Sequence, residues 1–235
     1  AANGARNHAH SPRGHANDAR APQGARQSTH RGSGQLRLIG GDFRRRKLPI
    51  PESPGLRPTP DRVRETLFNW LAFDIAGRRV LDLYAGTGAL GLEALSRGAA
   101  SAVFIDRDRA SVAIARANAA KLGEERNCRF AAADLGRPET VAAALRSDRP
   151  FDLVLLDPPY DAPAVAEAIL AGLVRSGRLA SPALVTVELA RGTDIVLPEA
   201  LRVLDRRRYG KADLLILGHA VADEGDDADD TGTAD

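Results

Sequence analysis

From residue 77 onwards, short apolar runs alternate with stretches whose apolar residues recur every three to four positions. The apolar runs are typical of buried strands, and the longer spacing is typical of amphipathic helices. Strands are predicted over 78–84, 101–106, 128–134, 151–157, 183–189 and twice within 201–218, and helices over 89–98, 109–122, 138–146 and 163–175. This alternation favours an α/β fold with a doubly wound, mainly parallel seven-stranded sheet, closed by an antiparallel hairpin at Gly210-Lys211.

The segment before residue 77 follows a different pattern. Residues 35–50 alternate weakly and contain two adjacent glycines, which predicts a β-hairpin or two short strands with a basic edge. A proline-rich connector follows over 51–60, and a helix begins after it. Arg62 and Arg64 are expected outside the buried face of that helix. Helical spacing predicts that this face comprises Val63, Leu67, Trp70 and Leu71.

The net charge of +2 conceals a strong asymmetry along the chain. Residues 1–34 carry five arginines against one aspartate, the basic excess continues over 35–64, and residues 219–235 carry seven acidic side chains and no lysine or arginine. A basic front suits a polyanion such as nucleic acid, although a solubilising face would carry the same charge. We expect four segments: a disordered basic segment over 1–34, an extension of hairpin plus helix over 35–76, a catalytic domain over 77–218 and a disordered acidic tail over 219–235.

Cysteine content and hydropathy narrow the cellular setting. The only cysteine, Cys128, excludes an internal disulfide and a zinc site built from several thiolates, so we expect no metal and a reducing compartment. No run approaches the roughly 18 apolar residues of a membrane span, and the N-terminal residues lack the apolar stretch of a secretory signal. These features predict a cytoplasmic protein that binds no membrane.

Each of the first four predicted strands ends at or near a carboxylate. The carboxyl ends of parallel strands meet at one edge of the sheet, and ligands of open α/β sheets bind there. Four acids in succession are hard to explain by core packing, so they are candidate ligand-binding residues. These are Asp82, Asp106, Asp134 and Asp157.

The first strand is followed by GTGALG, in which Gly86, Gly88 and Gly91 match the G-x-G-x-x-G pattern, and Asp106 lies twenty residues beyond Gly86. The pattern suits an adenosine-containing cofactor whose ribose hydroxyls bind the acid, and by itself it fits a nicotinamide cofactor as well. Purely structural roles fit the same residues. A tight turn with close helix–strand packing would account for the glycines, a helix N-cap for Asp106, and a cap or turn for Asp134.

The fourth strand ends in Asp157-Pro158-Pro159-Tyr160. The prolines fix their own φ angles and restrict the residue before them, so the chain leaves the sheet stiff and extended. An exocyclic amine of a nucleobase attacks poorly because its lone pair is delocalised into the ring. Asp157 and the carbonyl of Pro158 can accept its two N–H groups and turn the lone pair towards an incoming methyl group, while Tyr160 stacks on the extruded base. This corner favours methyl transfer over hydride transfer.

The motifs DLYAGTG and DPPY resemble those of the S-adenosylmethionine-dependent amino-methyltransferases. The longer stretches RLIGGDFRRRKLPIP, GLRPTPDRVRETLFNWL and LDLYAGTGALGLEALSRGA resemble the bacterial 16S rRNA guanine-N2 methyltransferases, over roughly residues 36–218. The resemblance implies a Rossmann-like class I methyltransferase fold and methyl transfer from S-adenosylmethionine to the exocyclic N2 of a guanine. It implies that Asp157, Pro158, Pro159 and Tyr160 hold the guanine. The residues implied to bind the cofactor are Asp82, Tyr84, Gly86, Gly88, Asp106 and Asp134.

The resemblance also implies that the extension over 35–76 binds RNA. The residues expected to meet phosphates are Arg44, Arg45, Arg46, Lys47, Arg57 and Arg62. A hairpin edge protected by charge would also account for the basic run. The expected substrate is 16S rRNA in the assembled small ribosomal subunit, and the expected enzyme is a monomer. Three positions depart from the family: Tyr84 replaces a usual Phe, Thr87 a common Ser, and Arg45 a frequent glycine, which leaves the shape of the basic loop open.

Three other functions fit parts of the sequence. An NAD-dependent oxidoreductase would account for GTGALG and Asp106. A DNA adenine-N6 or cytosine-N4 methyltransferase would share DPPY, but the chain leaves little room for a target-recognition domain. A non-enzymatic RNA-binding module would account for the basic segment, and it predicts that Asp157→Ala leaves every activity of the protein intact.

Overall fold

A computed structural model describes residues 34–50, 61–159 and 163–220 of the 235-residue chain. Two of the predicted site residues, Arg57 and Tyr160, lie outside the described residues. The same holds for the proline-rich connector and for nearly all of the two terminal segments whose disorder the sequence predicts. The three exceptions are Gly34, which begins the first strand, His219, which ends the last, and Ala220, which follows it.

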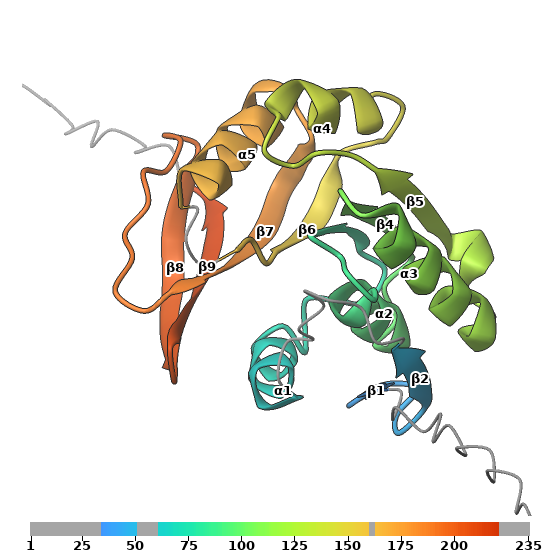
Figure 1. Cartoon of the computed structure of the whole chain (residues 1–235). Helices are drawn as coiled ribbons and strands as arrows, with labels where there is room; N and C mark the ends of the chain where they lie inside the picture. The colour runs from blue at the N-terminus through green and yellow to red at the C-terminus, as the bar shows by residue number, and fades with distance from the viewer. Residues whose placement is uncertain (1–33, 51–60, 160–162, 221–235) are drawn as a thin grey trace, which may run out of the picture. The chain divides into compact units, whose positions relative to one another are not determined.

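A seven-stranded sheet forms the centre of the described part, in the order β5-β4-β3-β6-β7-β9-β8 (Figure 1). Within this sheet, strands β3 to β7 are parallel, and β9 is antiparallel to both of its neighbours. This confirms the predicted mainly parallel sheet with an antiparallel edge hairpin. The strands are β3 (Arg79–Leu83), β4 (Ser101–Asp106), β5 (Cys128–Ala132), β6 (Phe151–Leu156), β7 (Leu179–Ala190), β8 (Leu201–Tyr209) and β9 (Ala212–His219).

The helices follow the predicted order, and their ends have local causes. Asp108 caps α3 through bonds from the backbone nitrogens of Ala110 and Ser111, and Gly123 ends it with a φ of 81°. The observed bounds of this helix and of α5 match the predicted ranges, 109–122 and 163–175. The helices are α1 (Asp61–Trp70), α2 (Ala89–Ser96), α3 (Arg109–Leu122), α4 (Pro138–Ala144) and α5 (Pro163–Arg175), with a short 3-10 turn η1 (Glu125–Asn127).

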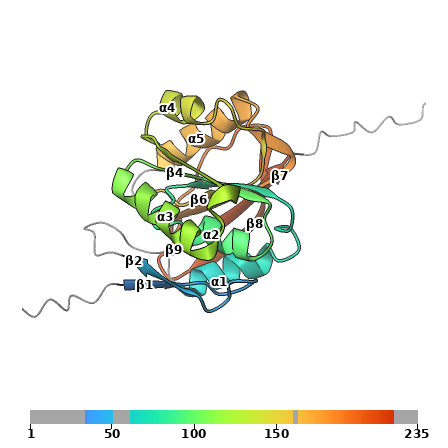
Figure 2. The ribbon, with the colours of Figure 1, turned by 90° about the vertical axis from the view of Figure 1, so that its right-hand side faces the viewer.

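The sheet separates two hydrophobic clusters. One cluster packs α4 and α5 against one face. The other packs α2 and α3 against the opposite face, together with α1 and the two-stranded hairpin β1 (Gly34–Arg37) and β2 (Lys47–Ile50). Figures 1 and 2 show the two helical layers on either side of the strands. The N-terminal extension therefore shares its core with the α/β part of the chain from residue 77 onwards.

The buried face of α1 differs from the predicted one. Arg64, which was expected outside this face, and Phe68, which was not predicted, are both 0% exposed. Val63 and Trp70, which were predicted to be buried, are only partly buried. The observed face follows the spacing i, i+3, i+4 and i+7 from Arg64 through Leu71. Burial of the guanidinium is supported by Arg64 Nη2, which donates to the carbonyl of Arg37 at 2.9 Å and to an Asp61 oxygen at 2.6 Å.

Candidate active site

The turn after β3 carries unusual backbone conformations at the carboxyl edge, defined here as the edge of the sheet where the parallel strands end. Gly86 and Gly88 have φ angles of 52° and 81°, which glycine adopts at little cost. Tyr84 has a φ of 61°, which is rare for a residue with a bulky side chain. Strained backbone of this kind concentrates at functional sites, where the surrounding structure must enforce it.

Asp82 is buried beneath this turn, at 1% exposure. One carboxylate oxygen accepts the backbone N–H of Gly91 at 2.8 Å. A Cβ at Gly91 would lie 2.4 Å from a Phe104 ring carbon, so only glycine lets α2 approach the sheet this closely. Burial raises the pKa of Asp82 to about 8, the bond from Gly91 opposes the shift, and the charges of Asp157 and Asp106 add to it.

Asp106 connects two parts of the edge. One of its oxygens accepts the backbone N–H of Gly86 at 2.9 Å, and the other accepts that of Asp108 at 2.9 Å. Asp106 does not cap α3, because Asp108 performs that task. Each carboxylate oxygen can accept more than one hydrogen bond, so Asp106 keeps acceptor capacity for a ligand hydroxyl.

Asp134 is exposed and makes a local turn contact. Its Oδ1 accepts the backbone N–H of Gly136 at 3.0 Å, as expected of an aspartate in a turn. It also lies near Tyr84: burial raises the pKa of the Tyr84 hydroxyl, and the charge of Asp134 is the next contributor. The structure thus brings Tyr84, Asp106 and Asp134 to the same edge.

The Asp157-Pro158-Pro159 corner lies beside the turn after β3. The backbone N–H of Asp157 points to the carbonyl of Leu83 at 3.5 Å, which anchors the corner to β3. Pro158 is buried, Pro159 is exposed and Asp157 is half-buried. The corner is therefore fixed on one side and open to solvent on the other.

The residues at this edge fit S-adenosylmethionine by their chemistry. Asp106 and Asp157 both lie within electrostatic range of the buried Asp82 and raise its pKa. A sulfonium cofactor with an ammonium group would offset the negative charge at this edge, and its ribose diol suits an acceptor such as Asp106. Among the described residues, no cluster of three or more His, Cys, Asp or Glu side chains is arranged to hold a metal ion. No helix in the same part of the chain is long and apolar enough to cross a membrane.

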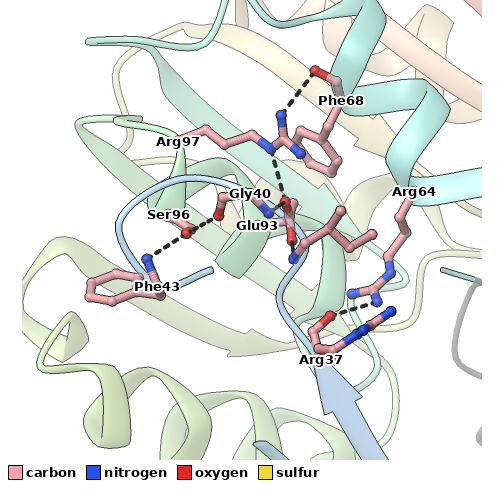
Figure 3. A network of polar contacts seen from close by, with 9 residues as sticks. Arg37, Gly40, Phe43, Arg64, Phe68, Glu93, Ser96 and Arg97 are labelled. Carbon is pink, nitrogen blue, oxygen red and sulfur yellow. Dashed lines mark hydrogen bonds and ion pairs between the residues drawn. The ribbon is translucent and has the colours of Figure 1, made fainter. Parts of the chain in front are cut away.

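The basic loop (residues 38–47) is held by the other end of α2. Glu93 is 0% exposed and accepts the backbone N–H groups of Ile39 and Gly40, each at 2.8 Å, and the Nε–H of Arg97 at 2.8 Å. The Arg97 guanidinium lies 5.2 Å from the centre of the Phe68 ring, so it joins the loop to α1. Figure 3 shows Glu93 and Arg97 between the loop and this helix.

The two glycines of the loop are required by its close approach to α2. A Cβ at Gly41 would lie 1.7 Å from the backbone oxygen of Ser96, and a Cβ at Gly40 would lie 2.5 Å from the Arg97 guanidinium. The Ser96 hydroxyl oxygen accepts the backbone N–H of Phe43 at 3.0 Å (Figure 3). The loop therefore docks backbone against backbone.

The four basic residues from Arg44 to Lys47 are exposed, but they do not lie at the carboxyl edge. The end of α2 precedes the start of β4, and the loop contacts that end. Arg46 donates to the carbonyl of Lys121, in the last turn of α3 and therefore also towards the amino edge. Arg62 is exposed on α1. The structure thus brings the predicted cofactor residues and Asp157 together and separates them from the predicted phosphate-binding loop.

Comparison with known proteins decides the family. The sequence profile of the family described as Conserved hypothetical protein 95 matches residues 36–218. The chain belongs to this family. It is 47% identical to Ribosomal RNA small subunit methyltransferase D of Escherichia coli over 69% of this chain and 79% of that protein. It is 36% identical to the protein of the same name from Haemophilus influenzae, over 77% and 93% of the two chains. The resemblance found in the sequence is thereby confirmed.

Solved structures agree with the fold. The Escherichia coli protein yhhF superposes with a TM-score of 0.70 at 36% identity, covering 80% of this chain and all of that one. SMU.776, solved in complex with SAH, superposes with a TM-score of 0.57 at 16% identity, covering 73% of this chain and 53% of that one. The second likeness is one of fold alone, and the predicted Rossmann-like methyltransferase fold is confirmed.

Sequence reasoning missed the contribution of Glu93, Ser96 and Arg97. All three lie in the ALGLEALSRG stretch, which is otherwise typical of a buried apolar helix. A charged residue on the buried side of such a helix is costly unless it is paired, so Glu93 was the available signal for a tertiary contact. The partners of Glu93 could not be found from the sequence, because its carboxylate accepts backbone N–H groups 53 and 54 residues away.

Proposed function

We propose that the protein transfers a methyl group from S-adenosylmethionine to the exocyclic N2 of a guanine in 16S rRNA. The observation that carries the proposal is the rigid corner at Asp157-Pro158, placed beside the carboxylates of Asp82 and Asp106. The relatives named as small-subunit rRNA methyltransferases support rRNA as the substrate class. SAH, bound to a protein of the same fold, is the demethylated form of the proposed cofactor.

The chain's own part in the reaction is to bind, align and hold. Asp106 would accept a ribose hydroxyl, and the turn from Gly86 to Gly88 would lie against the adenosine. Asp157 and the Pro158 carbonyl would accept the two N–H groups of the guanine amine and aim its lone pair. When bound, S-adenosylmethionine supplies an electrophilic methyl group. The amine becomes more acidic as it is methylated, so its proton can pass to Asp157 or to water without a strong base.

Binding of the RNA would involve two regions. The Asp157 corner would hold the extruded base, and Tyr160 would stack on it. Arg44, Arg45, Arg46 and Lys47 would meet phosphates further along the RNA, because the basic loop lies at the other edge of the sheet. We expect the assembled small subunit to be the substrate, since an RNA shaped by proteins can present both contacts at once, and we expect the enzyme to act as a monomer in the cytoplasm.

The test is methyl transfer from tritiated S-adenosylmethionine to unmethylated small subunits, to naked 16S rRNA and to DNA, followed by digestion to nucleosides. The expected product is N2-methylguanosine from the subunits. Label found only in DNA would assign the protein to the DNA amino-methyltransferases instead. Calorimetry with S-adenosylmethionine and with NAD provides an independent measurement, and tight NAD binding without S-adenosylmethionine binding would refute the proposal.

A further inference from the structure

The far end of the β8–β9 hairpin lies at the carboxyl edge. Because β9 is antiparallel to β7, it begins where β7 ends: Ala190 is opposite Ala212, and Tyr209 is opposite Ala212 on the other side. The hairpin turn at Gly210-Lys211 is therefore on the same edge of the sheet as the Asp157 corner. We call this end of the hairpin, with the first residues after β7, the hairpin tip (residues 190–194 and 206–213).

The hairpin tip projects beyond the end of β6, alongside the corner. Leu156, the last residue of β6, is opposite Val187 of β7, and β7 continues to Ala190. Three further residues in a strand extend about 10 Å. A nucleic acid whose base enters the corner must pass beside this projection, because only one strand, β7, lies between β6 and the hairpin.

The cations of the hairpin tip differ in how far carboxylates of the fold compensate their charge. Arg206 binds two aspartates, with bonds of 2.8 Å to Asp194 and 2.7 Å to Asp213, so its charge is compensated. Arg208, in contrast, is 67% exposed at its side chain and lies 4.0 Å from Asp213. The bonds from Arg206 and from the backbone N–H of Gly192 all reach Asp213 Oδ2, whereas Arg208 is paired with Oδ1, which accepts no hydrogen bond among the described residues. This pair is longer than a hydrogen bond, so the exposed Arg208 guanidinium can still donate to a second anion.

Two more cations complete the surface. Arg191 and Lys211 are exposed, and the backbone N–H of Arg191 donates to the carbonyl of Lys211 at 2.8 Å, which joins the two segments that carry them. Within the described residues, neither side chain forms an ion pair with a carboxylate. Long cationic side chains on a projecting edge suit the phosphates of a nucleic acid backbone, which attract them without regard to base sequence.

We propose that Arg191, Arg208 and Lys211 form a second phosphate-binding surface, which holds the RNA strand next to the target nucleotide. This rests on the proposed function, and it adds a contact near the chemistry to the distant one made by the basic loop. The two surfaces would hold the RNA on either side of the corner. Binding at both would orient the strand so that the target base faces Asp157.

The test compares two triple variants with the same loss of charge. The first is Arg191→Gln, Arg208→Gln and Lys211→Gln. The control is Arg146→Gln, Arg149→Gln and Arg175→Gln, which removes three exposed cations from the amino edge, two ahead of β6 and one ahead of β7. Affinity for unmethylated small subunits and for naked 16S rRNA is measured without cofactor at several salt concentrations, with thermal unfolding and S-adenosylmethionine affinity as checks on the fold.

The hairpin-tip variant is expected to bind RNA about tenfold more weakly at physiological salt. The slope of log K against log salt should fall by about 2, since each lost phosphate contact contributes roughly 0.7–0.9. The control should change the slope by less than about 1. Equal weakening by the two triples, or unchanged binding by the hairpin-tip variant, would overturn the proposal. Wild-type protein that binds RNA and yields no N2-methylguanosine would instead contradict the proposed function.

Discussion

Asp82 and Glu93 are buried carboxylates that lie towards opposite edges of the sheet: Asp82 accepts a backbone N–H of helix α2, and Glu93 belongs to that helix. Glu93 accepts two backbone N–H groups and the guanidinium of Arg97. Asp82 accepts one backbone N–H and feels the charges of Asp157 and Asp106, which contribute with burial to a pKa of about 8.

The difference separates a carboxylate that the fold compensates from one that it does not. A buried charge that receives a cation and two N–H groups is compensated by the fold itself. A buried acid with like charges near it keeps its proton to a higher pH, and a bound cation would favour its ionised form. The amino edge therefore holds the basic loop in place, and the carboxyl edge has the charges that the proposed cofactor would offset. Substitutions at both edges test this contrast.

The largest effect is expected at the catalytic corner. Asp157→Ala should lower the rate of methyl transfer by about 10³-fold, or about 4 kcal/mol of activation free energy, because the guanine amine loses an aligned acceptor. Affinity for S-adenosylmethionine and thermal stability should change little. Asp157→Asn keeps one oxygen acceptor and should lose less. Methyl transfer by the alanine variant at the wild-type rate would contradict a role for Asp157 in aligning the guanine amine.

Glu93→Ala should destabilise the protein by about 3 kcal/mol. It leaves the N–H groups of Ile39 and Gly40 and the Arg97 guanidinium without their buried acceptor. Urea unfolding measures the loss, and the exposed Glu65→Ala on α1 provides a control that should change stability by less than about 0.5 kcal/mol. Cofactor affinity of the folded Glu93 variant should stay within about twofold of wild type. Similar free energies of unfolding for the two variants would mean that the contacts of Glu93 with the basic loop and Arg97 do not stabilise the fold.

The raised pKa of Asp82 should make the free energy of unfolding depend on pH. Its pKa is raised from 3.8 to about 8 on folding, so the folded protein keeps a proton that the unfolded chain releases between these values. Stability should therefore fall as pH rises through this range, by up to about 1.4 kcal/mol per pH unit, and level off above pH 8. Urea unfolding at pH 5.5, 6.5 and 7.5 should show a smaller fall in Asp82→Asn. Equal slopes in the two proteins would contradict the assignment, and Asp42→Asn, at an exposed position, is the matched control.

The smallest effect concerns the shape of the basic loop. Arg45 has a φ of 68°, where an L-residue with a side chain is strained and glycine is not. This explains why a glycine suits the position. Arg45→Gly should stabilise the protein by about 0.5–1 kcal/mol. Thermal unfolding should show no such gain for Arg44→Gly, and a loss of stability in Arg45→Gly would show that its side chain contributes a contact.

Local signals in the sequence were sufficient for most of the fold. Helix α3 could be bounded because its ends are set by neighbouring residues, and most of the strands because they are short apolar runs. Strand β7 begins at Leu179, before the predicted start at residue 183, because Leu179 pairs with Phe151 of β6 across the sheet. That pairing is a tertiary contact and leaves no mark in the local pattern. The same reason explains the misplacement of Arg64, whose guanidinium is buried against Arg37 and Asp61.

The candidate site was predictable in part, for a related reason. The carboxyl ends of parallel strands converge whatever the loops do, so Asp82, Asp106 and Asp157 could be placed together from spacing alone. The position of the basic loop depends on which end of α2 it docks to, and this follows from the fit of Gly41 against Ser96. The hairpin tip was missed because Arg191 is distant in sequence from Arg208 and Lys211, and its segment joins theirs only when β9 pairs with β7.

Strand β8 has a consequence for contacts between copies of the protein. It is the last strand of the sheet, and among the described residues it pairs only with β9. An open strand edge invites a second molecule to add its own strand, which leads to dimers or aggregates. The exposed side chains of Arg202, Arg207 and Arg208 line this strand, so two such edges brought together would set guanidinium groups against one another. Arg208, which we assign to nucleic acid, thereby also disfavours self-association through the sheet.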